Sequence, residues 1–175
     1  MYREKLLQKI DKLDKEVEGL ISNLKAYSTK QLQSKPAPDV WSPIQILNHI
    51  ILSEQRSLEY CKKKLSFDPK LKKASWRSWM NSRLVMLALI SPFKFKAPGA
   101  VAEDQFSNSD TLDSIETKWK ATREDWRTYI SDLSEKYLDK EVYKHPFGMR
   151  MSLGGMLDFF LTHFHRHRKQ LLKRI

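Results

Sequence analysis

The sequence is poor in the residues that build covalent or glycine-rich scaffolds. Cys61 is its single cysteine, so neither an internal disulfide nor a zinc cluster made of cysteines is possible, and we expect a buried thiol there. Only five glycines occur among 175 residues, and few segments alternate polar and apolar residues with a period of two. Because such alternation is typical of strands, its rarity favours a fold made mainly of helices.

Long hydrophobic runs are also absent. The longest apolar run, residues 84–90, is far shorter than the roughly 20 residues that a membrane-spanning helix needs. The first residues, Met-Tyr-Arg-Glu-Lys, carry charge and lack the apolar core of a signal peptide. The length and a hydrophobic fraction of 41% suffice for one domain with a sizeable core. We therefore expect a cytoplasmic protein without a membrane partner, folded as one domain over residues 1–175.

Acidic residues are scarce relative to basic ones, which leaves a formal net charge of +11. The densest basic patch runs from Lys62 through Lys73 to Arg77, where Asp68 is the only acid. A solvated surface is our first interpretation of this patch, and attraction of an anionic substrate is the second. Nucleic acid is a third and less favoured partner, because no helix-turn-helix, RNA-binding sheet or zinc-finger pattern accompanies the charge.

Apolar residues recur every three or four positions, as they do along the buried faces of helices. The pattern and its start signals predict helices over residues 3–26, 43–63, 76–90, 111–133 and 153–173. The clearest start lies at Ser42, which forms a capping box with Gln45 and is followed by proline. Residues 65–110 are less regular, with Pro92 ending a helix and an extended crossover over residues 93–99. A sharp connection is predicted at residues 145–148.

Three of the five histidines lie within five residues near the C-terminus. His163 and His167, four positions apart, project from one face of the predicted last helix, whereas His165 points to the other side. Such a pair is a usual way for a helix to present two nitrogens to one metal ion. His49 lies in an apolar part of the predicted second helix and faces its interior side, which makes it the natural third ligand.

Three imidazoles from two helices are compatible with an open metal site, because catalytic zinc commonly takes three protein ligands and keeps a fourth position for water or substrate. Nickel, iron, manganese and cobalt accept similar ligands. The alternative for each histidine is an ordinary interior or surface side chain. We expect His145 to shape its loop rather than bind metal, and His165 to be exposed. We interpret the carboxylates of Glu54 and Asp158 as solvated.

Three segments stand out together: Trp41-Ser-Pro-Ile-Gln-Ile-Leu-Asn-His49, His145-Pro-Phe-Gly148 and His163-x-x-Arg166-His167-x-x-Gln170. In order, spacing and loop motif the chain resembles the DinB/YfiT-like superfamily, over roughly residues 3–65 and 110–173. The resemblance implies an all-α four-helix bundle of up-down-down-up topology, here with an irregular, partly helical crossover in the middle. It also implies a divalent metal, often nickel or zinc, bound by His49, His163 and His167.

Characterised relatives of that type include thiol-dependent transferases and isomerases that use bacillithiol, mycothiol or glutathione, and others are described as metal-dependent hydrolases. The resemblance thus implies an enzyme that activates a thiol or water toward a small-molecule substrate, with a low-molecular-weight thiol as a candidate cofactor. The alternatives are a non-catalytic metal-binding or stress-response module and, less favoured, a nucleic-acid-binding protein. Such relatives often form homodimers through helix faces, and Trp76 and Trp79 are candidates either for that contact or for the local core.

Overall fold

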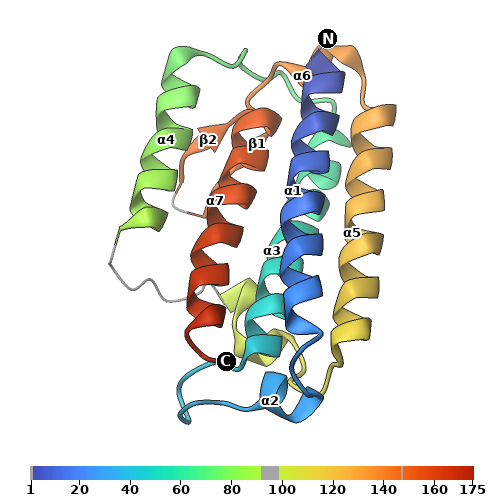
Figure 1. Cartoon of the computed structure of the whole chain (residues 1–175). Coiled ribbons are helices and arrows are strands. Elements are labelled where there is room, and N and C mark those ends of the chain that lie inside the picture. Colours follow the sequence, from blue (N-terminus) through green and yellow to red (C-terminus); the bar gives the residue numbers. More distant parts are fainter. Residues whose placement is uncertain (1, 92–98, 147) are drawn as a thin grey trace.

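Four long helices form a bundle in the computed structural model, which describes residues 2–91, 99–146 and 148–175. They are α1 (Tyr2–Leu24), α3 (Pro43–Leu65), α5 (Leu112–Asp132) and α7 (Leu153–Leu172). Helices α1 and α3 each pack against both α5 and α7. In Figure 1, α1 and α7 run from top to bottom, and α3 and α5 run from bottom to top. The predicted all-α class is confirmed, and these helices begin and end within about two residues of the predicted positions.

The starts of the helices follow from their capping residues. The Ser42 side chain accepts a hydrogen bond from the Gln45 backbone N–H, and the Gln45 side chain accepts one from the Ser42 backbone N–H. This reciprocal capping box is repeated by Ser28 and Gln31 before the short α2 (Thr29–Gln33). Ser152 caps α7 by accepting from the Gly155 N–H. Because a cap fixes where the first turn begins, it also fixes which residues face the interior.

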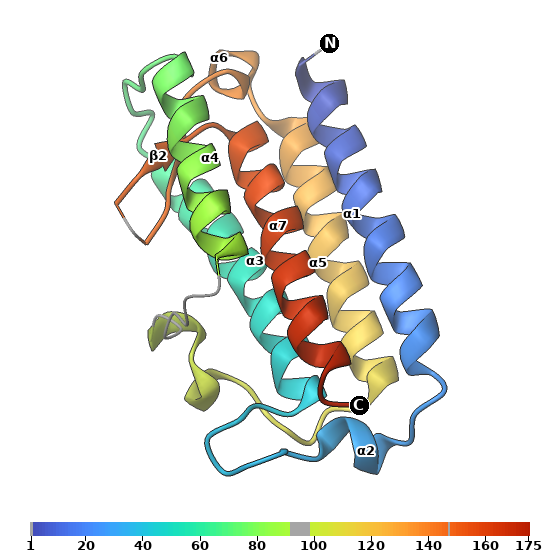
Figure 2. The same ribbon diagram turned by 60° about the vertical axis from the view of Figure 1, so that its left-hand side comes forward.

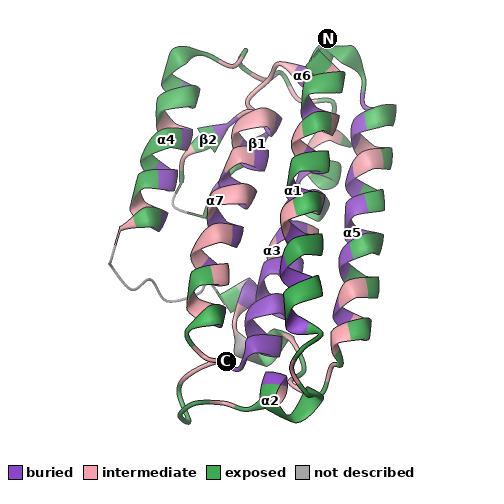
Figure 3. Ribbon diagram, viewed as in Figure 1, coloured by how far each residue is buried: buried purple, intermediate pink, exposed green. Residues whose placement is uncertain are grey.

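The inner faces of the helices meet in a dense apolar core, shown as the buried sides of the ribbons in Figure 3. Its largest fully buried side chains include Trp119 and Trp126 from α5 and Phe160 and Phe164 from α7. Cys61 is also fully buried, as the sequence predicts, and burial raises the pKa of its thiol. That thiol therefore stays protonated and acts as a small apolar side chain.

A further helix, α4 (Trp76–Ile90), lies outside the bundle and packs against α7 (Figures 1 and 2). The two helices approach closely at Gly155, where a Cβ atom would clash with the Ser82 hydroxyl. Arg166 of α7 donates to the backbone carbonyls of Leu89 and Ser91 and so holds the C-terminal end of α4. Of the two roles left open for Trp76 and Trp79, the structure excludes the local core, because these side chains are 66% and 61% exposed.

Several of the described connections contain short structured pieces. A single turn of helix, α6 (Glu135–Leu138), precedes an antiparallel hairpin of β1 (Tyr143–Lys144) and β2 (Arg150–Met151). Gly148 in the predicted sharp connection has φ +84°, which glycine tolerates and other residues resist. The 3₁₀ turns η1 (Gly99–Val101) and η2 (Glu103–Gln105) belong to the irregular middle of the chain.

Parts of three predictions lie outside the described residues: the helix stop at Pro92, the extended crossover over residues 93–98, and Phe147 of the loop motif. Within the described ranges, the helices are all too short or too polar to cross a membrane. The sequence pattern did not predict the hairpin as a strand pair, because two-residue strands are too short to show an alternating pattern. It did not predict the 3₁₀ turns η1 and η2 either.

Candidate metal centre

The structure brings the three predicted ligands together inside the bundle. His49 comes from α3, and His163 and His167 lie one turn apart on α7. One nitrogen from each ring lies within 4.8 Å of those from the other two. All three side chains are buried, with at most 9% of their surface exposed. Residues separated by more than 100 positions in the chain therefore form one compact group of imidazoles.

The orientation of His49 is set by a backbone carbonyl. Its Nδ1 lies 2.8 Å from the carbonyl oxygen of Val101 in η1. A carbonyl oxygen can only accept a hydrogen bond, so the proton of the neutral ring must be on Nδ1. The Nε2 atom then carries a free lone pair and points at the other two histidines. Metal-binding histidines are commonly fixed in this way, by a hydrogen bond from the nitrogen that does not bind the ion.

The spacing of the three Nε2 atoms suits a metal ion better than it suits hydrogen bonding. The Nε2 atom of His163 lies 3.3 Å from that of His49 and 3.0 Å from that of His167. A single Nε2–H cannot serve both contacts, so at least one pair of nitrogens lacks a well-placed proton. A tetrahedral ion with bonds of about 2.0–2.1 Å would hold its ligand nitrogens roughly 3.3 Å apart. The donor set therefore fits a divalent cation.

Burial keeps these rings neutral. Burial, with a smaller contribution from nearby His49, lowers the pKa of His167 to about 3. Burial is also the main cause that lowers the pKa of His163 well below its usual range, with the neighbouring histidines adding to it. The pKa of His49 is lowered by burial and partly restored by the hydrogen bond to Val101. Neutral imidazoles are the form that binds metal, so the protein presents all three ready to coordinate.

Aromatic side chains enclose the group. Phe159 stacks nearly parallel on the ring of His163, with their centroids 5.4 Å apart. The Trp41 ring lies 5.0 Å from His49 on the other side. Such apolar walls lower the local dielectric constant and strengthen any interaction between the rings and a charge placed among them. Sequence reasoning missed the role of Phe159, although its position four residues before His163 on the same helix face could have indicated it.

The two remaining histidines lie outside the group of three. His145, in the hairpin connection, is buried against the ring of Phe159 at a centroid distance of 4.7 Å, and burial lowers its pKa to about 4. Its backbone N–H donates to the Met149 carbonyl, and its carbonyl accepts from the Gly148 N–H, which agrees with the expected role in shaping the loop. His165 lies on the outer side of α7, partly exposed and 3.4 Å from Glu16.

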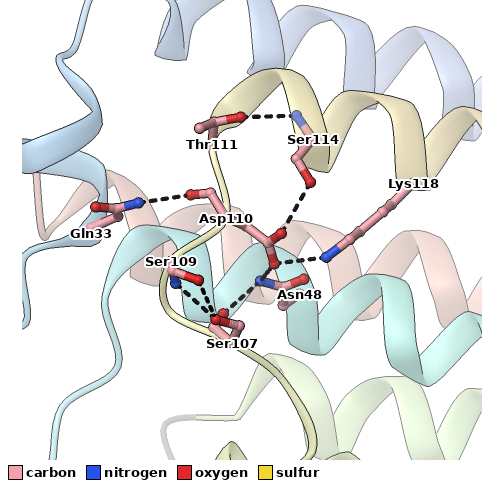
Figure 4. A network of polar contacts seen from close by, with 8 residues as sticks. All are labelled: Gln33, Asn48, Ser107, Ser109, Asp110, Thr111, Ser114 and Lys118. Carbon is pink, nitrogen blue, oxygen red and sulfur yellow. Dashed lines mark hydrogen bonds and ion pairs between the residues drawn. The ribbon is translucent and has the colours of Figure 1, made fainter.

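A polar network holds the segment after η2 against α3 beside His49 (Figure 4). Asn48 donates to the backbone carbonyl of Ser107 and to the carboxylate of Asp110. That carboxylate also accepts from Lys118 and Ser114. Burial acts to raise the pKa of Asp110, but these hydrogen bonds outweigh it and keep the pKa below its usual value. The network thus holds Asn48, the neighbour of His49, against Ser107 and Asp110, which follow Val101 in the chain.

The interpretation of Glu54 as solvated is wrong. Its side chain is 1% exposed and pairs with Arg123 of α5, whose Nη2 lies 2.9 Å from the carboxylate. Burial raises the pKa of Glu54 to about 7, although Arg123 pulls it back. The signal was present in the sequence, because Arg123 lies on the same face of α5 as the buried Trp119 and Trp126. Asp158 is partly exposed and pairs with Lys9.

Comparison with known proteins finds a family match. A family model described as the DinB superfamily matches residues 6–171. No curated protein and no solved structure matches the chain. The match includes all three clustered histidines as well as the hairpin and the outer helix α4.

Proposed function

The chain belongs to the DinB superfamily, and on that basis and that of its converging imidazoles we propose that it is a divalent-metal-dependent enzyme. It acts on a small substrate by transfer to a thiol or by hydrolysis. The observation that carries the proposal is the set of three Nε2 atoms, one of them 3.0 Å and 3.3 Å from the other two. Nickel and zinc are the proposed ions, because both accept imidazole nitrogens in such a site.

His49, His163 and His167 would hold the ion. A divalent cation in such a site supplies a Lewis acid that makes a water or thiol nucleophilic near neutral pH. The Val101 carbonyl fixes the His49 ring, so that its lone pair is directed before any ligand arrives. Trp41 and Phe159 limit the access of bulk water to the site. These residues therefore orient the donors and keep their surroundings apolar.

The C-terminal end of α7 offers an approach for a charged small molecule. Gln170, one turn after His167, lines an open groove with Lys173, Arg174 and the segment around Pro36 and Val40. Two cations in this groove favour an anionic substrate or an anionic low-molecular-weight thiol over a cationic one. The groove is lined by none of the three histidines, and Gln170, three residues after His167 on α7, is the lining residue that lies nearest to them along the chain.

The first test is the metal content, measured by elemental mass spectrometry on protein purified without chelator and without a histidine tag. We expect about one nickel or zinc per chain, and loss of the ion in the variant His167→Ala. The matched control is His165→Ala, which removes the same side chain from the outer side of the same helix and should keep the ion. Absence of metal from all three proteins after incubation with both ions would contradict the proposal.

The second test is a reaction screen of the metal-loaded protein. It combines bacillithiol, mycothiol and glutathione with electrophilic substrates, and it includes esters for hydrolysis. We expect turnover with the wild-type protein and with His165→Ala, and none with His167→Ala. A stoichiometric metal without turnover across the panel would favour the alternative of a non-catalytic metal-binding or stress-response module.

A further inference from the structure

The outer face of α4 is largely apolar, and no other part of residues 2–91, 99–146 and 148–175 covers it. Six large apolar side chains on this helix are between 38% and 70% exposed: Trp76, Trp79, Met80, Leu84, Leu87 and Ile90. At about 100° per residue they fall within a sector of roughly 140°. The opposite face carries Val85, Met86 and Leu89, which are buried toward the rest of the protein. The helix is therefore apolar on both sides, and only one side is used by the fold.

The uncovered area is larger than a monomer usually leaves. With full side-chain areas of about 150–250 Å² for such residues, the six expose on the order of 600–700 Å². The largest apolar patch on a typical monomeric protein is roughly 300–600 Å², and such patches are commonly functional. Exposed Arg83 falls inside the same sector, so the face consists of apolar side chains around one cation. Apolar exposure of this size along one helix favours a partner.

The same part of the chain has a large share of the net positive charge. Residues 62–83 contain six lysines, two arginines and one acid, a formal charge of +7 out of +11 for the whole chain. Helix α4 itself contains no acidic residue. Lys72 and Lys73, which directly precede it, are exposed. The uncovered apolar face thus continues into a cationic surface.

Two arginines on α4 lie against its exposed tryptophans. The guanidinium of Arg77 lies 5.8 Å from the Trp76 ring centroid, and that of Arg83 lies 5.2 Å from the Trp79 ring centroid. Indole rings and guanidinium groups both favour the boundary between lipid headgroups and acyl chains, where one side is apolar and the other is wet and anionic. Helices that lie in that boundary combine apolar and tryptophan side chains with lysines and arginines, as the outer face of α4 and the residues before it do.

We propose that α4 is a docking face for the surface of an anionic phospholipid bilayer. Its apolar residues enter the headgroup boundary, while Arg77, Arg83 and the preceding lysines contact the phosphates. Over its 15 residues the helix is about 22 Å long and lies along the membrane plane. The expectation of no membrane partner rested on the lack of a spanning segment, and a helix that lies on the surface needs none.

Charge selects the bilayer over the other occupants of such a face. A second copy paired through α4 would bring the arginines and lysines of both copies together with no acid on the helix to neutralise them. Single-stranded nucleic acid would stack on the tryptophans but leave Leu84, Leu87 and Ile90 without a role. Only an anionic bilayer satisfies both the aliphatic and the cationic side chains.

The test is sedimentation of the full chain with vesicles of phosphatidylcholine mixed with phosphatidylglycerol, and with vesicles of phosphatidylcholine alone. We expect binding to the mixed vesicles, weakening with salt, and little binding to the neutral ones. The variant Trp76→Ser/Trp79→Ser/Leu87→Ser should lower partitioning by at least about 10-fold. The variant Arg77→Gln/Arg83→Gln should lower it roughly 5-fold for each cation removed. The control Tyr2→Ser/Leu172→Ser removes exposed apolar groups from α1 and α7 and should bind as the wild type does.

The substituted side chains in each variant are solvent-exposed, and circular dichroism checks that each still folds. Equal binding to neutral and anionic vesicles would overturn the role of the cations, and no binding to either would overturn the proposal. A dimer by light scattering that the serine variant dissociates, with no vesicle binding, would assign the face to a second copy instead. Retention of single-stranded DNA that survives the serine changes, again without vesicle binding, would assign the cations to nucleic acid and also overturn it.

Discussion

Two buried polar groups lie on α3, only five residues apart, and the protein treats them in opposite ways. Around Glu54 the protein supplies a series of alternating charges. Arg123 pairs with both Glu54 and Asp14, and Arg127 pairs with Asp14. Around His49 it supplies the lone pairs of two more imidazoles, and the described contacts of the His49 ring include no acid or cation. The charges of the first group neutralise one another, although Glu54 Oε2 and Arg123 Nη1 keep no hydrogen-bond partner in the described part of the chain. The second group would gain its counter-charge from the proposed cation, and the two groups therefore differ in whether their partners carry opposite charge or the same lone-pair chemistry.

The largest expected effect of a substitution on stability comes from removing one charge of the Glu54–Arg123 pair. The variant Arg123→Met leaves the Glu54 carboxylate buried without its partner, and we expect the free energy of unfolding to fall by about 3–5 kcal/mol. Urea unfolding monitored by circular dichroism measures this. The control Arg127→Met removes a partly exposed arginine from the same set of ion pairs and should cost about 1 kcal/mol or less.

A second variant separates pairing from burial. Adding Glu54→Gln to Arg123→Met removes both charges, so most of the lost stability should return. If the double variant is as unstable as Arg123→Met alone, the single loss reflects packing around the arginine rather than an unpaired charge.

The contributions of the buried histidines and of Glu54 to the free energy of unfolding should depend on pH in opposite directions. Buried His145 and His167 have pKa values of about 4 and 3, below the usual value near 6.5. The unfolded chain binds protons at these sites first, so metal-free protein should lose on the order of 5 kcal/mol as pH falls from about 6.5 to 4, with roughly half from each histidine. Glu54 has a raised pKa of about 7. Its contribution is complete at low pH and is lost as pH rises through 7, which offsets part of the acid loss.

Unfolding by urea at a series of pH values measures the combined effect. The variant Glu54→Gln removes the opposing contribution, so its stability should fall more steeply with acid than that of the wild type. A wild-type stability that stays flat between pH 7 and about 4 while Glu54→Gln also stays flat would show that the histidines are not held neutral by burial.

The smallest effect concerns the support of the imidazole group. The variant Asn48→Ala removes two hydrogen bonds that tie α3 to the segment containing Ser107 and Asp110. We expect nickel or zinc affinity to fall by about 10-fold, or roughly 1.4 kcal/mol, because the residues that orient a ligand commonly contribute this much. Competition titration with a chromophoric chelator measures it. The control Gln55→Ala lies on α3, as Asn48 does, and breaks a hydrogen bond to Thr122 of α5. It should leave the metal affinity unchanged.

Much of the fold was predictable, because the helices carry complete local signals. The capping box at Ser42 and the spacing of apolar residues in α1 and α5 place those elements within about two residues. The hairpin was not predicted as strands, because its two-residue strands are set by contacts with the bundle rather than by local pattern. The outward turn of Trp76 and Trp79 was not determined either, since α4 has apolar residues on both faces and no local rule says which face packs.

The three-histidine group was predictable in part. The i, i+4 spacing of His163 and His167 on one helix is a local signal, and the apolar surroundings of His49 indicated an interior position. The hydrogen bond from His49 to the Val101 carbonyl was not predictable, because it joins residues 52 positions apart through an irregular segment. Backbone carbonyls carry no residue-specific signal, so sequence cannot reveal which of them fixes a ring.

The distance along the chain between the ligands has a consequence for biogenesis. His49 and His163 are 114 residues apart, so the site does not exist on a growing chain until α7 has been synthesised and has closed the bundle. Uptake of the proposed ion by all three ligands would therefore follow the synthesis of α7. A bound ion would act as a crosslink across a long loop, which is where a crosslink restricts the unfolded chain most. The ion would thus hold α7 to α3 and slow the separation of these two helices during unfolding.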